Sequence, residues 1–399
     1  MKTDSPAPRS PLPSDFSLIL GGPLFQLMRR AHLSGDVLEL LTRRIIVLSL
    51  LAWLPLLVLS IIEGRAWGGV RVPFLMDVDV HARFLLALPL FIAAELLVHQ
   101  RMRLVVERFV SRGLVPDEVR DKFDAAIAAA IRLRNSVLVE VLLVAFVYGF
   151  GVLYLWRTHW AIDATTWYRE TTGGALRPTL AGWWFGFVSL PMVQFIVMRW
   201  YFRLFIWARF LWHVSRIKLR LVPCHPDRAA GLGFVSGIVF AFQPLLVGQG
   251  VLLAGAMANK IFYAGAKLPD FKVELLGWVT MMVLFVLAPL LVFIPLLART
   301  KRDGTAEFGA FAQSYVRDFE HKWLRGGASP EQRPLGSADI QSLADLSNSY
   351  EVVKGIKLVP LSKQAVLQLA VISLLPVAPL LLTVIPLGEL VDRFLKIIF

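Results

Sequence analysis

Cysteine and charge are the two things that this sequence has least of. Cys224 is the single cysteine among 399 residues, which excludes an intramolecular disulfide and any zinc or iron–sulfur site built from clustered cysteines. Charged residues make up only 18% of the chain, against 56% hydrophobic residues and a mean hydropathy of +0.63. A soluble protein with a charged surface needs a more polar balance, so a membrane protein is indicated.

Long apolar runs take the place of the missing charges. A helix needs about 20 apolar residues to cross roughly 30 Å of hydrocarbon, and uninterrupted runs favour helices over the alternating pattern of a transmembrane β-barrel. The sequence therefore predicts an all-α fold, a polytopic transmembrane helical bundle of about seven spans. They are expected near 45–62, 84–99, 136–156, 182–198, 232–257, 275–298 and 365–387.

Basic residues alternate along the chain in a way that predicts the topology. The segments between the expected spans contain 6, 3, 8, 3, 7, 3, 10 and 2 lysines plus arginines, in chain order. Basic segments stay on the cytoplasmic side, so we expect the N-terminus inside and the C-terminus outside. The expected parts are a cytoplasmic segment 1–44, a six-span bundle with helical cytoplasmic loops 45–298, a helical cytoplasmic loop 299–364, and the last span with a short external tail 365–399.

Tryptophans and net charge fit the same topology. Indole rings favour the membrane interface, and they fall at expected external span ends (Trp156, Trp160, Trp183, Trp184, Trp278) and internal ones (Trp200, Trp207, Trp212). Much of the net charge of +13 lies where anionic lipid would attract it, at about 1 kcal/mol per basic residue. We therefore expect anionic membrane lipids on the cytoplasmic side as partners, and no nucleic acid.

Three cytoplasmic segments are expected to be helical. Residues 117–134 begin with acidic residues after Pro116 and predict a helix that runs without a break into the third span. Residues 199–220 carry six basic residues among Trp, Phe and Leu, which predicts a helix that leaves the bilayer and lies along its surface. Residues 299–364 contain two amphipathic runs, from Glu307 to Trp323 and from Ser337 to Lys354. No apolar core follows Lys2 at signal-peptide distance, so we expect no cleaved leader.

Two carboxylates lie inside expected spans, where an ionised group disfavours insertion by roughly 3 kcal/mol. Glu95 in the second span and Glu140 in the third lie at matching depth near the cytoplasmic side. One hypothesis is a proton or cation site formed by Glu95, His99 and Glu140, because histidine titrates near neutrality and paired carboxylates share protons. The alternative is a set of structural ion pairs with Arg199 and Arg203, which share one helix face, or with the nearby Arg101.

The fifth span is rich in glycine and contains Gln243-Pro244 near its middle. Small residues at four-residue spacing favour close helix packing. A broken helix whose freed carbonyls, with Gln243 and Gln249, line a pathway is the alternative. In the loop before it, Asp227 is placed to cap the helix, and His225 with Arg228 could hold an anion or a lipid phosphate at its electropositive end.

Three stretches carry a resemblance to a known group. They are Pro223-Cys-His-Pro-Asp-Arg-Ala-Ala-Gly-Leu-Gly-Phe234, Leu335-Gly-Ser-Ala-Asp-Ile-Gln-Ser-Leu-Ala-Asp-Leu346, and the ending from Ala378 to Leu390. The chain resembles a family of uncharacterised bacterial multi-pass membrane proteins, mainly in its second half. The resemblance implies a bacterial inner-membrane location and brings no activity, cofactor or catalytic residue.

Three functions of different classes remain on the sequence alone. A channel or transporter for a small ion draws on Glu95, Glu140 and the interrupted fifth span. A membrane scaffold or sensor draws on the long basic cytoplasmic segments. A membrane enzyme would need a convergent catalytic set, and no spacing links His99, His213, His225 and Asp227 into one. We expect no cofactor and no metal, and a homo-oligomer is compatible with each function.

Overall fold

The chain is mostly helical, at 78%. The computed structural model describes residues 17–18, 21, 41–155, 165–172, 175–329, 331–332, 336–361 and 363–384. Within them, six helical stretches are long and apolar enough to cross a membrane, as a multi-pass membrane protein requires. These stretches are Leu41–Ile62, Val78–Ser111, Leu180–Ser215, Gly233–Ala264, Leu268–Leu291 and Lys363–Thr383.

The span expected at 136–156 is shorter than the others. It begins with α6 (Val137–Phe146), runs into the π-helical segment η5 (Val147–Leu155), and counts as a shorter apolar helix over Val137–Gly151. The expected unbroken helix from 117 into this span was wrong, because α5 (Arg120–Arg134) ends before it. The break follows from Ser136, whose φ of −71° and ψ of 111° are extended rather than helical.

Two of the stretches are much longer than the spans expected from hydropathy. The first consists of α3 (Val78–His81), η3 (Ala82–Ala87) and α4 (Leu88–Ser111). The second consists of α8 (Leu180–Trp184), η6 (Phe185–Ser189) and α9 (Leu190–Ser215). Their 34 and 36 residues correspond to about 50 Å, well beyond a hydrocarbon core of about 30 Å. The helices continue past the apolar runs because arginine, glutamate and leucine are all good helix formers.

The stretch Gly233–Ala264, which is the fifth expected span, changes its helix type at Gln243. The 3-10 helix η7 (Gly233–Phe242) gives way there to α10 (Gln243–Ala264), with Pro244 in the first turn. Three glycines of α10 lie against other helices, since a Cβ atom would meet Phe91 at 2.6 Å from Gly248, a backbone oxygen at 2.4 Å from Gly250, and the Asp79 Cα at 3.0 Å from Gly255. These glycines therefore allow three neighbours to approach closely.

Proline punctuates the second half of the bundle. After the 3-10 turn η8 (Leu268–Phe271), α11 (Lys272–Leu291) ends, and Pro295 follows in the first turn of α12 (Ile294–Trp323). The remaining elements are α2 (Leu41–Ile62), η2 (Phe74–Met76), η4 (Asp117–Val119), β1 (Arg169–Thr172), β2 (Ala175–Pro178), α13 (Ala338–Lys354), α14 (Lys363–Leu374) and η9 (Leu375–Thr383). The two strands form one antiparallel hairpin.

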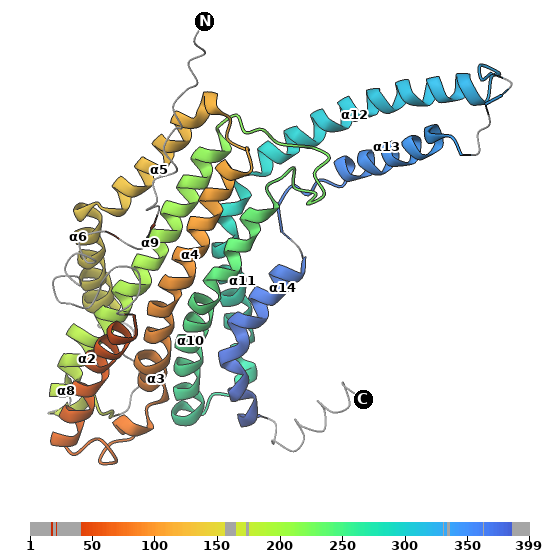
Figure 1. The fold of residues 1–399 in the computed structure, drawn as a ribbon. Helices are drawn as coiled ribbons and strands as arrows, with labels where there is room; N and C mark the ends of the chain where they lie inside the picture. Colours follow the sequence, from red (N-terminus) through yellow and green to blue (C-terminus); the bar gives the residue numbers. More distant parts are fainter. Residues whose placement is uncertain are drawn as a thin grey trace, which may run out of the picture.

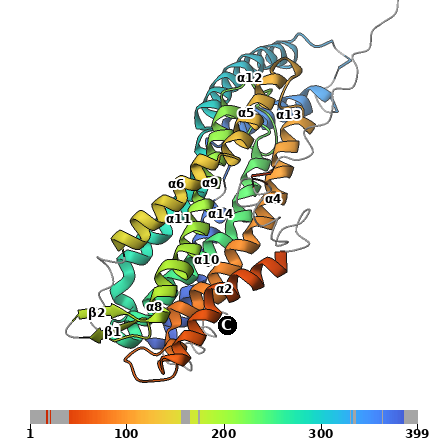
Figure 2. The ribbon, with the colours of Figure 1, turned by 90° about the vertical axis from the view of Figure 1, so that its left-hand side faces the viewer.

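The two ends of the bundle differ in what they carry. Figures 1 and 2 show α5 and the pair α12–α13 at one end, and the β1–β2 hairpin with α8 at the other. The pair α12–α13 extends away from the bundle as an antiparallel arm (Figure 1). Lys322 Nζ lies 2.7 Å from Asp339 Oδ2, and the Tyr315 hydroxyl donates to the Asp339 carbonyl at 3.1 Å, which ties the two helices of the arm together.

Two of the tryptophans expected at the inner interface are core residues instead. Trp200 and Trp207 are both 0% exposed, so neither can reach lipid head groups. Trp212 and Trp183 are exposed at 45% and 51% and remain available to an interface. Trp156 and Trp160 lie outside the described residues. The tryptophan pattern therefore supports the expected orientation less than the basic residues do, because burial in a helix bundle competes with the interface for indole rings.

Candidate functional site

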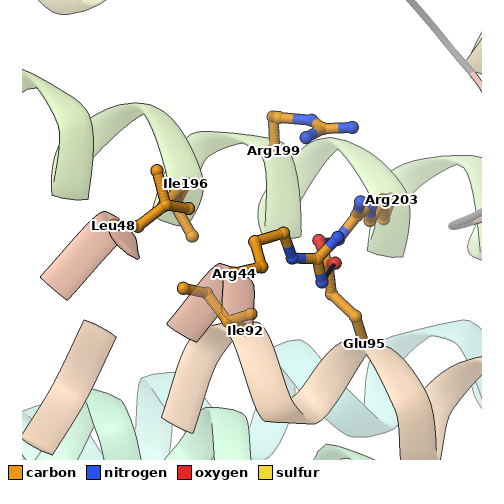
Figure 3. A pocket seen from close by; sticks show the side chains of 7 residues that line it. All are labelled: Arg44, Leu48, Ile92, Glu95, Ile196, Arg199 and Arg203. Carbon is orange, nitrogen blue, oxygen red and sulfur yellow. Dashed lines mark hydrogen bonds and ion pairs between the residues drawn. The ribbon is translucent and has the colours of Figure 1, made fainter. Parts of the chain in front are cut away.

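Five charged side chains from four helices meet inside the bundle, and we call them the arginine cluster. They are Arg44 on α2, Glu95 on α4, Glu140 on α6, and Arg199 and Arg203 on α9. Arg203 Nη1 donates to Glu95 Oε1 at 2.7 Å, and Arg44 Nη2 donates to Glu95 Oε2 (Figure 3). Arg199 Nη2 lies 3.8 Å from Glu140 Oε1. Each oxygen of Glu95 thus has its own guanidinium partner.

Local helix geometry explains why these groups meet. Arg199 and Arg203 are four residues apart on α9 and therefore lie on one face, which is turned toward α2 and α4. Glu95 is 8% exposed, Arg203 5% and Arg44 9%. Buried charges are tolerated when they are paired and hydrogen-bonded, and each oxygen of Glu95 has such a partner.

A small cavity opens between the helices of the cluster. Its volume is about 10 Å³, which is room for about one water molecule. Charged and apolar side chains share its wall: Arg44, Leu48, Ile92, Glu95, Ile196, Arg199 and Arg203 (Figure 3). The site therefore offers guanidinium donors to one small guest, within walls that are otherwise apolar.

Further groups hold the cluster in place. The Arg203 guanidinium lies 5.0 Å above the Trp200 ring, whose Nε1 donates to the Phe91 carbonyl at 3.0 Å. A fourth arginine, Arg134 on α5, donates to the Ser17 carbonyl. Burial, and then repulsion from the nearby Arg203, lower the pKa of Arg134. Positive charge thus accumulates at this end of the bundle.

The structure separates the other residues of the expected ion pathway from the cavity. His99 Nδ1 bonds to the Ser17 hydroxyl at 2.8 Å, and His99 is absent from the wall of the cavity. Gln249 Nε2 donates to the Tyr201 hydroxyl at 3.1 Å, which links α10 to α9. Gln243 is half-buried at the junction of η7 and α10. Glu95, Glu140, Arg199 and Arg203 are therefore the expected residues that the fold brings together.

In the loop before η7, the carboxylate of Asp227 occupies the place expected for an external anion. The Asp227 carboxylate accepts the backbone N–H groups of Ala229 at 2.8 Å, Gly231 at 3.1 Å and Gly233 at 2.8 Å. Partial burial works against the charged form, but these donors outweigh it and lower the pKa of Asp227. The side chain reaches Gly233, the first residue of η7, from six positions upstream and is not the N-cap residue, which is Leu232.

The two residues of this loop that were expected to bind an external anion, His225 and Arg228, have other contacts in the structure. His225 Nδ1 is 3.0 Å from Asp227 Oδ1. Arg228 lies against the C-terminal end of α13, because a Cβ atom on Gly355 would be 3.4 Å from its Cδ, and its carbonyl accepts the Lys357 N–H at 2.9 Å. Anion binding by His225 and Arg228 stays a prediction, with the helix end itself occupied by Asp227.

A second buried carboxylate lies at the end of the bundle that carries β1–β2. Asp77 is 3% exposed. Its carboxylate accepts hydrogen bonds from Asn259 Nδ2 at 2.7 Å, from Trp167 Nε1 at 2.7 Å and from the Val80 N–H at 3.1 Å. We call these four residues the Asp77 network. Burial, and then the neighbouring Asp79, raise the pKa of Asp77 despite the three donors.

Sequence reasoning missed Arg44 and Asp77. Arg44 reads as one of the basic residues that precede the first span, where such residues are expected in any case. Asp77 reads as a polar residue of a loop between spans, where a carboxylate is ordinarily solvated. Only the Asp-Val-Asp spacing of Asp77 and Asp79 just before an apolar run is a signal, and it indicates a helix start rather than a buried site.

The described residues contain no group of three or more His, Cys, Asp or Glu side chains that could hold a metal ion. Comparisons with protein-family models, with curated proteins and with solved structures find no match to this chain. The geometry of the arginine cluster is therefore the main evidence for the function.

Proposed function

We propose that the protein is a channel or transporter for a small ion, and that the arginine cluster is the binding site where the ion enters or leaves the bundle. The observation that supports this is that four charged side chains from three helices (Arg44, Glu95, Arg199 and Arg203) line a cavity of about 10 Å³, and that Glu140 lies 3.8 Å from Arg199. Charge inside a span is costly and commonly marks an ion pathway. Two arginines would suffice to neutralise Glu95 and Glu140, so structural ion pairs alone do not account for three.

The proposed topology has seven spans with the N-terminus inside and the C-terminus outside, in a bacterial inner membrane. This topology adds Val137–Leu155, the third span in chain order, to the six long stretches. The alternation of basic residues along the sequence supports the topology. This topology puts the arginine cluster on the cytoplasmic side. Reporter fusions after Arg302 and at the C-terminus should report opposite compartments, and matching compartments would contradict the topology.

Anionic lipid and a second copy of the chain are the proposed partners. Exposed arginines beyond the apolar part of α4, such as Arg101 and Arg112, support the first. The apolar face of α11, with Val273 exposed at 81% and Leu276 at 71%, supports contact with lipid or with a second copy. Mass measurement of the purified protein in detergent distinguishes a monomer from an oligomer.

Ion flux through proteoliposomes tests the proposed function directly. Purified protein should carry a current or a tracer flux that Glu95→Gln and Arg203→Gln reduce strongly. Arg209 is exposed on the same helix α9, so Arg209→Gln is the matched control and should leave the flux unchanged. Absence of flux for chloride, sodium, potassium and protons alike would overturn the proposal.

The arm α12–α13 supports a second candidate function, that of a scaffold or sensor. The arm extends away from the bundle (Figure 1), and Phe311 on α12 is 60% exposed. Its base touches the loop before η7, because Gly304 lies against Pro223 and Val353. Gly304→Val would displace the arm, and a scaffold should then lose its partner while any flux persists.

A further inference from the structure

The charges of the arginine cluster do not balance. Arg44, Arg199 and Arg203 carry three positive charges, and Glu95 and Glu140 carry two negative ones. The excess is concentrated at Arg199, because both oxygens of Glu95 are taken by the other two arginines. The 3.8 Å contact of Arg199 with Glu140 is too long for a hydrogen bond.

The donors of Arg199 face the cavity without a hydrogen bond to any described group. A guanidinium has five N–H donors and no acceptor, and the Arg199 side chain is only 12% exposed. Arg199 and Arg44 both line the cavity, and each has donors to spare. A cation placed there would face three guanidiniums and one carboxylate, Glu95, whose two oxygens already accept from Arg44 and Arg203. The wall is therefore net positive, and in surroundings of low dielectric it repels a cation. An anion would accept the free donors.

The size of the cavity narrows the class of anion. About 10 Å³ holds about one water-sized guest, which excludes phosphate, sulfate and carboxylate ligands without a rearrangement of the helices. Leu48, Ile92 and Ile196 form apolar walls, and such walls suit a weakly hydrated ion that gives up its water easily.

We infer that the cavity of the arginine cluster binds a monatomic anion of the halide class, held by Arg199 and Arg44. The Glu95–Arg203 pair orients Arg44 by fixing one of its nitrogens. The inference rests on the proposed function, because it identifies the class of ion that binds at the proposed binding site. It does not require flux, because binding can be measured in the solubilised protein.

Binding is tested by thermal unfolding of the full-length protein in detergent, at constant ionic strength, as sodium gluconate is replaced by sodium bromide. A bound halide stabilises the folded state in proportion to the logarithm of its concentration above Kd, so the melting temperature should rise with bromide. Sodium phosphate at the same ionic strength should produce no such rise, since phosphate does not fit.

The variants identify the binding group. Arg199→Gln should raise the apparent Kd for bromide about tenfold or more, because a hydrogen bond to a charged group contributes at least that factor. Arg199→Lys keeps the charge and should bind with intermediate affinity, which covers the case in which the glutamine variant fails to fold. Arg209→Gln is the control and should match the wild type. Equal bromide stabilisation in Arg199→Lys, Arg199→Gln and the wild type would overturn the inference.

Flux measurements separate the inference from the proposed function. Bromide binding together with chloride flux supports both. Bromide binding without any flux supports the halide site and overturns the channel or transporter. Flux of sodium or protons without bromide binding overturns the halide site and leaves the transport function standing. If neither binding nor flux occurs, both are overturned.

Discussion

Glu95 and Asp77 are both buried carboxylates, and the bundle accommodates them in opposite ways. Glu95 is held by two guanidiniums from α2 and α9, so its negative charge is overcompensated by positive charge. Asp77 receives only neutral N–H donors, from Trp167, Asn259 and the backbone of Val80. The first arrangement surrounds a carboxylate with more positive charge than it needs, whereas in the second burial raises the pKa of Asp77 despite its donors.

The two carboxylates are far apart along the same helical stretch. At 1.5 Å per residue, Asp77 and Glu95 are about 27 Å apart, close to the thickness of the hydrocarbon core. In the topology proposed above, the two sites would therefore lie near opposite membrane boundaries. The comparison can be tested by removing each carboxylate and following stability.

Loss of Glu95 should have the largest effect. Glu95→Ala leaves Arg44 and Arg203 buried without their shared carboxylate, and removing one partner of a buried pair costs about 3 kcal/mol or more. Equilibrium unfolding in detergent measures the loss. The control is Glu107→Ala on the same helix, whose 2.8 Å pair with Arg103 is exposed and contributes about 1 kcal/mol or less. Equal losses for the two variants would mean that Glu95 is effectively solvated.

Loss of Asp77 should cost about 2 kcal/mol, somewhat less than loss of Glu95. Asp77→Ala strands three neutral donors, each with a penalty of about 1 kcal/mol or more when buried. The loss is partly offset because the variant removes the repulsion between Asp77 and Asp79 and leaves no buried charge behind. Trp167→Phe removes only one of the donors and should cost about 1 kcal/mol. The same unfolding experiment measures both. A loss for Asp77→Ala larger than that for Glu95→Ala would reverse the comparison.

Loss of Asp227 should cost about 1 to 2 kcal/mol, because three N–H groups of a half-buried loop lose their acceptor. The pKa of Asp227 is lowered on folding, so its contribution is present above the ordinary value of 3.8 and is lost as the pH falls through the lower folded value. Acid titration of the wild type against Asp227→Ala should therefore show the two stabilities converging below pH 3.8. A constant difference down to acid pH would show that Asp227 acts without its charge.

The smallest effect should be the pH dependence contributed by Asp77, and its sign is opposite. Burial and Asp79 raise the pKa of Asp77 above the ordinary 3.8, so its contribution is fully present below that value and is lost as the pH rises through the raised folded pKa. Wild type and Asp77→Asn should therefore diverge above pH 3.8, with the wild type losing stability relative to the variant. Parallel pH curves would mean that the pKa of Asp77 is not raised.

Sequence reasoning found four members of the arginine cluster, and one of its two alternatives paired the glutamates with Arg199 and Arg203, as the structure does; it missed the fifth member, Arg44. Glu95 and Glu140 stand out because an ionised side chain is costly in an apolar run, and Arg199 and Arg203 stand out by their four-residue spacing. Arg44 has no such signal, because it precedes its span. His99 shares a face with Glu95 in the sequence, but Ser17 is its partner in the structure, a contact between residues 82 positions apart that no local pattern predicts.

What the sequence determined by itself is the class of the molecule, an apolar helical membrane protein, because the length and composition of apolar runs act locally and add up along the chain. The sequence also located most of the spans. Two of the helices extend beyond the expected ends of their spans, because arginine and glutamate continue a helix after the apolar run has ended. The tertiary structure alone decided which charges meet. Ion pairs such as Arg44–Glu95 join residues 51 positions apart, and a cavity exists only where helices from distant parts of the chain fail to fill the space between them.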